Sequence, residues 1–191
     1  MNWNAKKFFF DIFLIVIFLP MICILLILIT LLIFIFNGKP IIFKSDRVGV
    51  NGKVFTMYKF RTMSIDTPLV ETDHLKNPAR YTTKLGSFLR KTSLDELPQI
   101  FNIISGKMTF IGPRPALPSQ HALNKARLAV GVLWCKPGVT GLAQVNGRDE
   151  LNLEEKVCFD HIYSQKRNLL FDLYIIIATV VKVLKLSNIR H

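Results

Sequence analysis

An apolar run close to the start of the chain, from Phe8 to Phe36, constrains the fold more than any other feature. Asp11 and Thr30 are its only clearly polar side chains. A helix needs about 20 apolar residues to cross the hydrocarbon core of a bilayer, so this run is long enough to do so. A secretory signal peptide explains it poorly, because the run is too long and no small-residue cleavage motif follows it. The run therefore predicts a helix held in a membrane.

Pro20 lies near the middle of the run, where its missing N–H kinks or breaks a helix. Basic residues flank both ends of the run: Lys6, Lys7, Lys39 and Lys44. The positive-inside rule favours the cytoplasmic side for each flank. A re-entrant helix that bends at Leu19–Pro20 satisfies both flanks, whereas a kinked spanning helix satisfies one. The sequence alone leaves both topologies open.

The charge balance favours anionic partners. The chain carries 25 basic and 13 acidic residues, a net charge of +12, which suits nucleic acid, an acidic membrane surface or phosphorylated substrates. We do not expect nucleic acid, because no basic helix, zinc-finger spacing or aromatic RNA-binding signature is present. Three scattered cysteines, none in a C-x-x-C motif, argue against a disulfide framework or a zinc site and fit a reducing compartment.

The rest of the chain predicts an α+β fold that is mostly helical. Asn51–Gly52, before the β-branched and aromatic stretch 54–60, predicts a small β-hairpin. Short helices are expected at 85–91, from the Ser93 cap to Gly106, at 117–133 and at 150–168, and a mobile loop at 66–81. Residues 168–186 carry charges that are costly in a bilayer centre, so we expect an amphipathic helix at the interface. This divides the chain into a membrane helix broken at Pro20 (1–38), which the resemblance described below identifies as re-entrant, and a cytosolic, membrane-associated domain (39–191).

An adjacent acidic pair, Asp95 and Glu96, has two explanations. Ser93 and Glu96 fit a capping box, and acidic residues stabilise the first turn of a helix through its dipole. Alternatively, side chains that diverge by roughly 100° on a helix do different jobs. One attacks or binds metal, and the other positions a partner or moves a proton. The local sequence permits both explanations.

Basic residues near expected turns and element ends are candidates for phosphate binding: Lys59, Arg61, Arg90, Arg114 and Arg148. Solvation explains any one of them equally well. Arg114 is more specific, because the prolines of Gly112-Pro113-Arg114-Pro115 fix the backbone on both sides of it. An aimed guanidinium suits bidentate binding of phosphate.

Five motifs, in this order along residues 6–186, resemble the bacterial sugar transferase family, the monotopic phosphoglycosyl transferases. They are KFRTM (59–63), SLDELPQ (93–99), GPRP (112–115), KPGVTG (136–141) and QVNGR (144–148). The length, with one membrane segment at the N-terminal end, is similar to that of the small members. The resemblance also implies a re-entrant helix, although small members often carry Ser-Pro at the bend where this chain has Leu19–Pro20.

The resemblance implies a reaction in which a UDP-sugar and polyprenol phosphate give polyprenol-diphosphate-sugar and UMP. It implies that Asp95 attacks the β-phosphate and forms a covalent intermediate, that Glu96 helps to hold Mg²⁺ or activates the acceptor, and that the basic candidates contact phosphate or nucleotide. It further implies the cytoplasmic face of the bacterial inner membrane, contact with phospholipid, possible downstream glycosyltransferases as partners, and a role in the first membrane step of glycoconjugate assembly.

Two other functions remain open on the residues alone. A non-catalytic membrane scaffold explains the positive charge and the apolar run, and treats the acidic pair as a helix cap. A membrane-bound nucleotidyl transferase or phosphatase uses the same carboxylates on a different bond. Metal-dependent release of UMP distinguishes the scaffold from the reaction that the resemblance implies. Product analysis distinguishes the second alternative, because release of UDP or of free sugar phosphate would contradict phosphosugar transfer.

Overall fold

The computed structural model describes residues 3–67, 78–147 and 150–184. Within them the elements are α1 (Trp3–Asn37), β1 (Ile42–Val48), η1 (Val50–Gly52), β2 (Val54–Phe60), α2 (Pro78–Tyr81), α3 (Lys84–Lys91), η3 (Leu94–Gln99), α4 (Ile100–Ile104), β3 (Thr109–Ile111), α5 (His121–Ala129), η4 (Val132–Trp134), β4 (Gly138–Thr140), α6 (Leu142–Asn146), α7 (Leu153–Lys166) and α8 (Leu169–Leu184). The expected α+β class, mostly helical, is confirmed.

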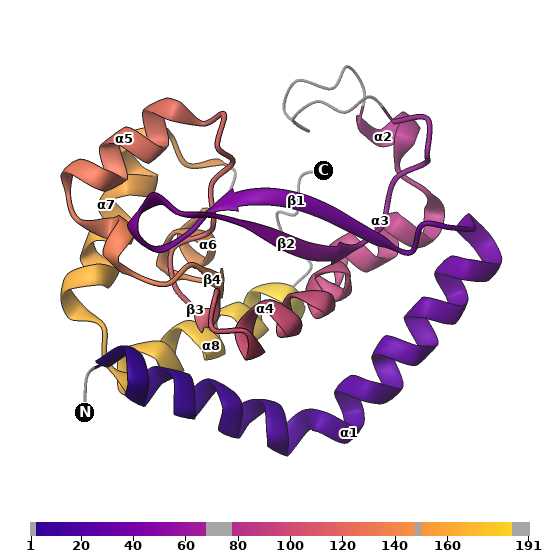
Figure 1. Cartoon of the computed structure of the whole chain (residues 1–191), viewed down its shortest axis with the longest axis horizontal. Helices are drawn as coiled ribbons and strands as arrows, with labels where there is room; N and C mark the ends of the chain where they lie inside the picture. The colour runs from indigo at the N-terminus through magenta and orange to yellow at the C-terminus, as the bar shows by residue number, and fades with distance from the viewer. Residues whose placement is uncertain (1–2, 68–77, 148–149, 185–191) are drawn as a thin grey trace.

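The apolar run forms a single helix, α1, of 35 residues that continues through Pro20. The expectation of a helix broken at Pro20 is therefore wrong in that respect. Figure 1 shows instead that α1 bends partway along: its first arm runs along the bottom of the view and its second arm rises along the right side toward β1. A proline removes one backbone donor and crowds the preceding turn, which is enough to bend a helix while the turns on either side persist.

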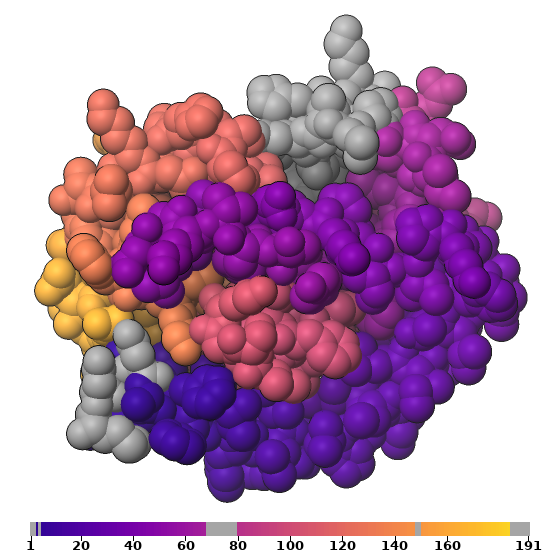
Figure 2. Space-filling model, viewed as in Figure 1, coloured from indigo at the N-terminus to yellow at the C-terminus, as the bar shows by residue number. Residues whose placement is uncertain are grey.

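One side of α1 packs on the rest of the chain, and the other side is bare. Ile15 and Ile22 join a core with Met57 of β2. Ile29 and Ile33 join a second core with Phe60 and Leu89, among others. Only 17% of the most apolar stretch of α1 is buried, unlike the core helix of a soluble protein. Figure 2 shows α1 as a continuous rim along the lower edge of the molecule. The rim is an apolar surface suited to lipid.

Both ends of α1 are tied to the same domain. Near its start, Lys7 forms a buried ion pair with Asp172 of α8, and Asp11 accepts a hydrogen bond from Thr109 of β3 at 2.6 Å. At its end, Asn37 donates to Thr83 at 3.1 Å. A helix that crossed a bilayer would carry one of these ends away from the domain.

The predicted hairpin is confirmed. β1 and β2 are antiparallel, paired from Ile42↔Phe60 to Val48↔Val54. Asn51 and Gly52 at the turn have φ of 56° and 74°, a region that Asn and Gly tolerate best. The strands are longer than the apolar letters suggest, because the middle of β1 is polar and lies half in solvent.

Two short strands were not predicted from the sequence. β3 and β4 are parallel and pair Thr109 with Gly138 and Ile111 with Thr140. Strands of three residues carry too little periodicity to be found in sequence. Gly112 and Gly138 permit the contact, since a Cβ on Gly138 would lie 2.1 Å from the Gly112 nitrogen. The strands place the Gly-Pro-Arg-Pro segment directly after β3.

The C-terminal half differs from expectation in its boundaries. The helix expected at 117–133 is α5 alone, which covers His121–Ala129, and Gly131 with φ of 74° separates it from η4. α7 begins at Leu153, and the N-cap residue before it, Asn152, forms a capping box with Glu155. α8 exposes an apolar side, as expected for an interfacial helix, but Asp172 is fully buried rather than solvated.

Candidate active site

The acidic pair lies on η3, a 3₁₀ helix, and the capping box predicted there is wrong. Ser93 has φ of 57° and ψ of 15°, and its side chain makes no capping hydrogen bond. An N-cap residue needs an extended backbone to aim its side chain at the third residue of the helix, and the left-handed conformation prevents this. The Glu96 side chain is therefore available for contacts outside its own helix.

Glu96 is bound by two cations from distant segments. Lys59 of β2 donates to Glu96 Oε1 at 2.7 Å, and both terminal nitrogens of Arg114 lie 3.3 Å from the same oxygen. The antiparallel hairpin delivers Lys59, and β3 delivers Arg114 through the proline-rich segment that follows it. Glu96 is 7% exposed, so these contacts form in a largely dry environment.

Asp95 has weaker attachments than its neighbour. The Lys59 nitrogen lies 3.7 Å from Asp95 Oδ2, an ion-pair distance that is too long for a hydrogen bond. Burial raises the pKa of the Asp95 carboxyl above its ordinary value of 3.8, and the Lys59 charge opposes this while the Glu96 charge adds to it. Burial also lowers the pKa of Lys59, against the attraction of Glu96. The pair thus combines a tethered carboxylate with a comparatively free one.

Arg90 reaches this site from α3. Its Nε donates to the Thr62 hydroxyl at 2.8 Å, and its charge acts on Asp95 to lower the pKa of that carboxyl. α3 approaches the segment after β2 very closely at Gly86, where an added Cβ would lie 1.9 Å from the Thr62 carbonyl oxygen. Only glycine fits there, and the close contact sets where Arg90 can point.

Four of the five predicted basic residues lie within the described chain, and three of them meet at the acidic pair: Lys59, Arg90 and Arg114. Arg61 has a different set of partners. It is buried and donates to the backbone carbonyls of Asn37 and Gly38 at the end of α1, where the last carbonyls of a helix lack partners. Arg148, and residues 68–77 of the expected mobile loop, lie outside the described residues; the loop's last part, Pro78–Tyr81, is helix α2.

Sequence reasoning missed two polar residues beside the site, Gln99 and Asn102. Asn102 is fully buried and clamps α4 to β2: it accepts from the Tyr58 N–H at 3.1 Å and donates to the Thr56 carbonyl at 2.8 Å. Because Lys59 follows Tyr58, this clamp fixes Lys59 relative to η3. A buried asparagine within an apolar helix is the only signal in the sequence.

The donor set bears on metal binding. No cluster of three or more His, Cys, Asp or Glu side chains that could hold a metal occurs within residues 3–67, 78–147 and 150–184. Asp95 and Glu96 supply two adjacent carboxylates. Mg²⁺ is commonly held by one or two carboxylates together with substrate phosphates and waters. The pair therefore fits a Mg²⁺ ion that the substrate helps to bind, and does not form a complete site without it.

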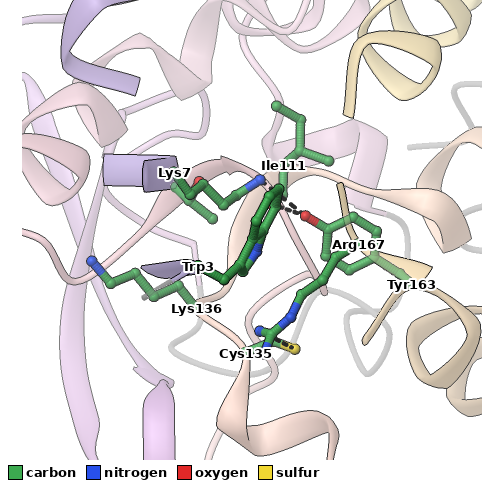
Figure 3. A pocket seen from close by; sticks show the side chains of 8 residues that line it. Trp3, Lys7, Ile111, Cys135, Lys136, Tyr163 and Arg167 are labelled. Carbon is green, nitrogen blue, oxygen red and sulfur yellow. Dashed lines mark hydrogen bonds between the residues drawn. The ribbon is translucent and has the colours of Figure 1, made fainter. Parts of the chain in front are cut away.

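A small pocket, separate from the acidic pair, lies at the start of α1 (Figure 3). Its lining comprises Trp3, Lys7, Thr109, Ile111, Cys135, Lys136, Tyr163 and Arg167. In Figure 3 the Lys7 ammonium points to the Tyr163 hydroxyl, 2.9 Å away, and Arg167 contacts Cys135. Lys7 and Tyr163 thus join α1 to α7 at this pocket, and the Lys7–Asp172 ion pair extends the connection to α8.

Comparisons with known proteins agree with the geometry. The family model described as bacterial sugar transferase matches residues 2–186. The uncharacterized sugar transferase EpsL of Bacillus subtilis is 40% identical over 81% of this chain and 75% of its own length. The UDP-glucose:undecaprenyl-phosphate glucose-1-phosphate transferase of Xanthomonas campestris is 40% identical over 76% of this chain. The undecaprenyl-phosphate galactose phosphotransferase of Salmonella typhimurium is 38% identical over 78%.

The relatives differ in length. This chain covers 32% of the Xanthomonas protein and 34% of the Salmonella protein, so the similarity lies in one part of those longer chains. The family match, by contrast, includes α1, the hairpin, the acidic pair and α8. The chain belongs to the bacterial sugar transferase family.

Proposed function

We propose that this protein is a phosphoglycosyl transferase that moves a sugar 1-phosphate from a UDP-sugar to polyprenol phosphate and releases UMP. The observation that carries the proposal is a buried acidic pair bound by cations from three separate segments, beside a helix with a bare apolar surface. Cations suit a diphosphate substrate, and the apolar surface suits a lipid-linked one. Relatives named for undecaprenyl-phosphate transfer, in glucose and galactose forms, support the substrate class.

Asp95 is the nucleophile in this proposal. A nucleophilic carboxylate must be ionised and free to approach phosphorus. Lys59 and Arg90 favour the ionised form of Asp95, and the Lys59 nitrogen stays 3.7 Å from Asp95 Oδ2. Glu96 is held at 2.7 Å by Lys59 and is less able to move. Its role is to hold Lys59 and Arg114 in place for phosphate and to offer a ligand for the metal.

The reaction then proceeds in two displacements. A carboxylate oxygen of Asp95 attacks the β-phosphorus of the UDP-sugar, the bond from that phosphorus to the bridging oxygen breaks, and UMP leaves with the bond electrons. A phosphate oxygen of polyprenol phosphate next attacks the same phosphorus and releases the Asp95 carboxylate. The cations at the site, Lys59, Arg90 and Arg114, stabilise the charge that gathers on the phosphoryl oxygens. Mg²⁺, when bound at Asp95 and Glu96, offsets charge on the diphosphate.

We further propose that α1 is re-entrant and that the domain lies on the cytoplasmic face of the bacterial inner membrane. Both ends of α1 contact the same domain, and basic residues flank both ends. This position presents the acidic pair to cytosolic UDP-sugar and to polyprenol phosphate in the bilayer. The product, a polyprenol-diphosphate-sugar, is a substrate for glycosyltransferases that extend a glycoconjugate, which are therefore expected downstream partners.

The chemistry is tested with the purified full chain in lipid nanodiscs. With Mg²⁺ and a panel of UDP-sugars but no acceptor, we expect one equivalent of UMP and a phosphosugar adduct on the peptide that contains Asp95. EDTA should abolish both, and Asp95→Asn should abolish turnover. Release of UDP or of free sugar phosphate would contradict phosphosugar transfer, and an active Asp95→Asn variant would refute the assignment of the nucleophile.

The topology is tested by labelling single cysteines, in a cysteine-free background, with a reagent that does not cross membranes. Cysteines at Asn2 and Ser45 should both react only from the cytoplasmic side. Labelling of position 2 from the outside would show that α1 spans the bilayer.

A further inference from the structure

The 3₁₀ geometry of η3 sorts its side chains into rows. A 3₁₀ helix has three residues per turn, so side chains at i and i+3 eclipse. Leu94 and Leu97 share one row and pack on the core beside α1. Glu96 and Gln99 share another row. Since Glu96 reaches Lys59 of β2, Gln99 points along the same side of the helix, about 6 Å farther along its axis.

The polar neighbours of Gln99 in the sequence, Glu96 and Asn102, both bind β2. Glu96 binds Lys59, and Asn102 binds the backbone of Thr56 and Tyr58 through both ends of its amide. Gln99 lies between them in the sequence and is 2% exposed. Its Nε2 nitrogen is buried and has no hydrogen-bond partner. No contact within the described ranges uses this donor.

A buried polar group without a partner costs about 1–3 kcal/mol, and most buried polar groups in folded proteins have one. The Gln99 amide lies one turn of η3 from Glu96, whose Oε1 oxygen already accepts from Lys59 and Arg114. A phosphate of the substrate would supply the acceptor that this donor lacks. Rotation about the terminal bond exchanges the amide nitrogen and oxygen, so the donor can be presented at either position of the amide.

We propose that Gln99 is a substrate-binding residue whose amide donates a hydrogen bond to a phosphate oxygen of the bound donor diphosphate. The inference rests on the proposed function, since it assigns Gln99 to the same site. It adds a neutral donor to the cations of the site. The 3₁₀ geometry of η3 matters here because it aligns Gln99 with Glu96, whereas an α-helix would place residue 99 about 60° away from residue 96. In the ligand-free protein the Nε2 nitrogen of Gln99 has no hydrogen-bond partner.

The test uses Gln99→Met, which keeps the length of the side chain and removes its polar atoms, with Gln165→Met on the exposed side of α7 as the matched control. Without ligand, Gln99→Met should have a thermal midpoint equal to or above that of the wild type, because it removes an unsatisfied buried group. A lower midpoint overturns the proposal, since it shows that the amide has a partner within the folded chain.

With substrate, kcat/KM for the UDP-sugar should fall about 10- to 100-fold in Gln99→Met, the usual range for a hydrogen bond to a charged group. The stabilisation of the protein by the UDP-sugar should shrink, and the apparent KM for polyprenol phosphate should stay unchanged. Unchanged kcat/KM for the UDP-sugar overturns the proposal. A loss confined to the KM for polyprenol phosphate also overturns it, because it assigns the amide to the acceptor. A wild-type enzyme that releases no UMP would instead refute the proposed function, while the thermal comparison still tests whether the amide is unpartnered.

Discussion

Removing the charge of Lys59 should shift the pH dependence of the enzyme. Lys59→Met deletes the cation 3.7 Å from Asp95 Oδ2. Two unit charges about 4 Å apart interact by about 4 kcal/mol at an effective dielectric constant of 20. A pKa change of one unit corresponds to about 1.4 kcal/mol, so this pair alone changes the pKa of Asp95 by about three units at most. Arg90 and Arg114 also lower the pKa of Asp95 and will compensate in part.

The direction follows from the causes of the pKa. Burial already raises the pKa of Asp95, and Lys59 opposes that rise. Without Lys59 the pKa rises further, and the acid limb of the rate profile moves to higher pH. We expect a move of about one pH unit, which is roughly a third of the Coulomb limit. Activity at neutral pH falls as well, because less of Asp95 is ionised and the phosphates lose a cation.

The assay is UMP release with saturating polyprenol phosphate in nanodiscs, with kcat/KM for the UDP-sugar measured from pH 5 to pH 9. This quantity reports the ionisation of groups in the free enzyme, and the titration of the acceptor is common to all variants. Lys59→Arg should keep the acid limb in place because it keeps the charge. Lys53→Met, at the exposed hairpin turn, is the control for loss of a lysine. An acid limb at the wild-type pH in Lys59→Met would refute the electrostatic role assigned to Lys59.

Three further changes probe the site and its supports. Asp95→Asn should abolish turnover but leave the thermal midpoint at neutral pH equal to or above that of the wild type. The pKa of Asp95 is raised in the folded state, so the ionised carboxylate lowers the stability of the fold as pH rises through that pKa. A fall of several degrees in the thermal midpoint would contradict this expectation. Gly86→Ala should destabilise the protein by about 1–3 kcal/mol through overpacking, although alanine favours a helix, and should lower activity by displacing Arg90. Ser87→Ala on the same helix is the control. Equal stability of the two variants would count against the close contact at Thr62. Lys7→Met should cost about 3–5 kcal/mol by leaving Asp172 buried without its cation, and the double variant Lys7→Met/Asp172→Leu should recover much of the loss in thermal unfolding; no recovery would show that the pair is not the source.

Features encoded within a few residues could be predicted. The apolar run, the Asn51–Gly52 turn and the helix at Lys84–Lys91 all depend on local composition or backbone preference, and all are present. The candidate residues of the acidic pair were also identifiable, because their motifs are short and contiguous. The capping box at Ser93 failed even though its residue types fit, because Ser93 directly follows Thr92, the C-cap residue of α3, and takes the left-handed conformation there.

By itself, the sequence determined that this chain carries a long apolar helix with a proline near its centre, an antiparallel hairpin and the motifs of its family. The tertiary structure alone decided that Glu96 is tethered and Asp95 comparatively free, that Arg61 serves the end of α1, and that Asp172 lies buried against Lys7. These contacts join residues far apart in the chain, 37 positions for Lys59 and Glu96 and 165 for Lys7 and Asp172. Local sequence preferences act over a few residues, so the pairing of such distant charges is set only when the core folds and excludes water from between them.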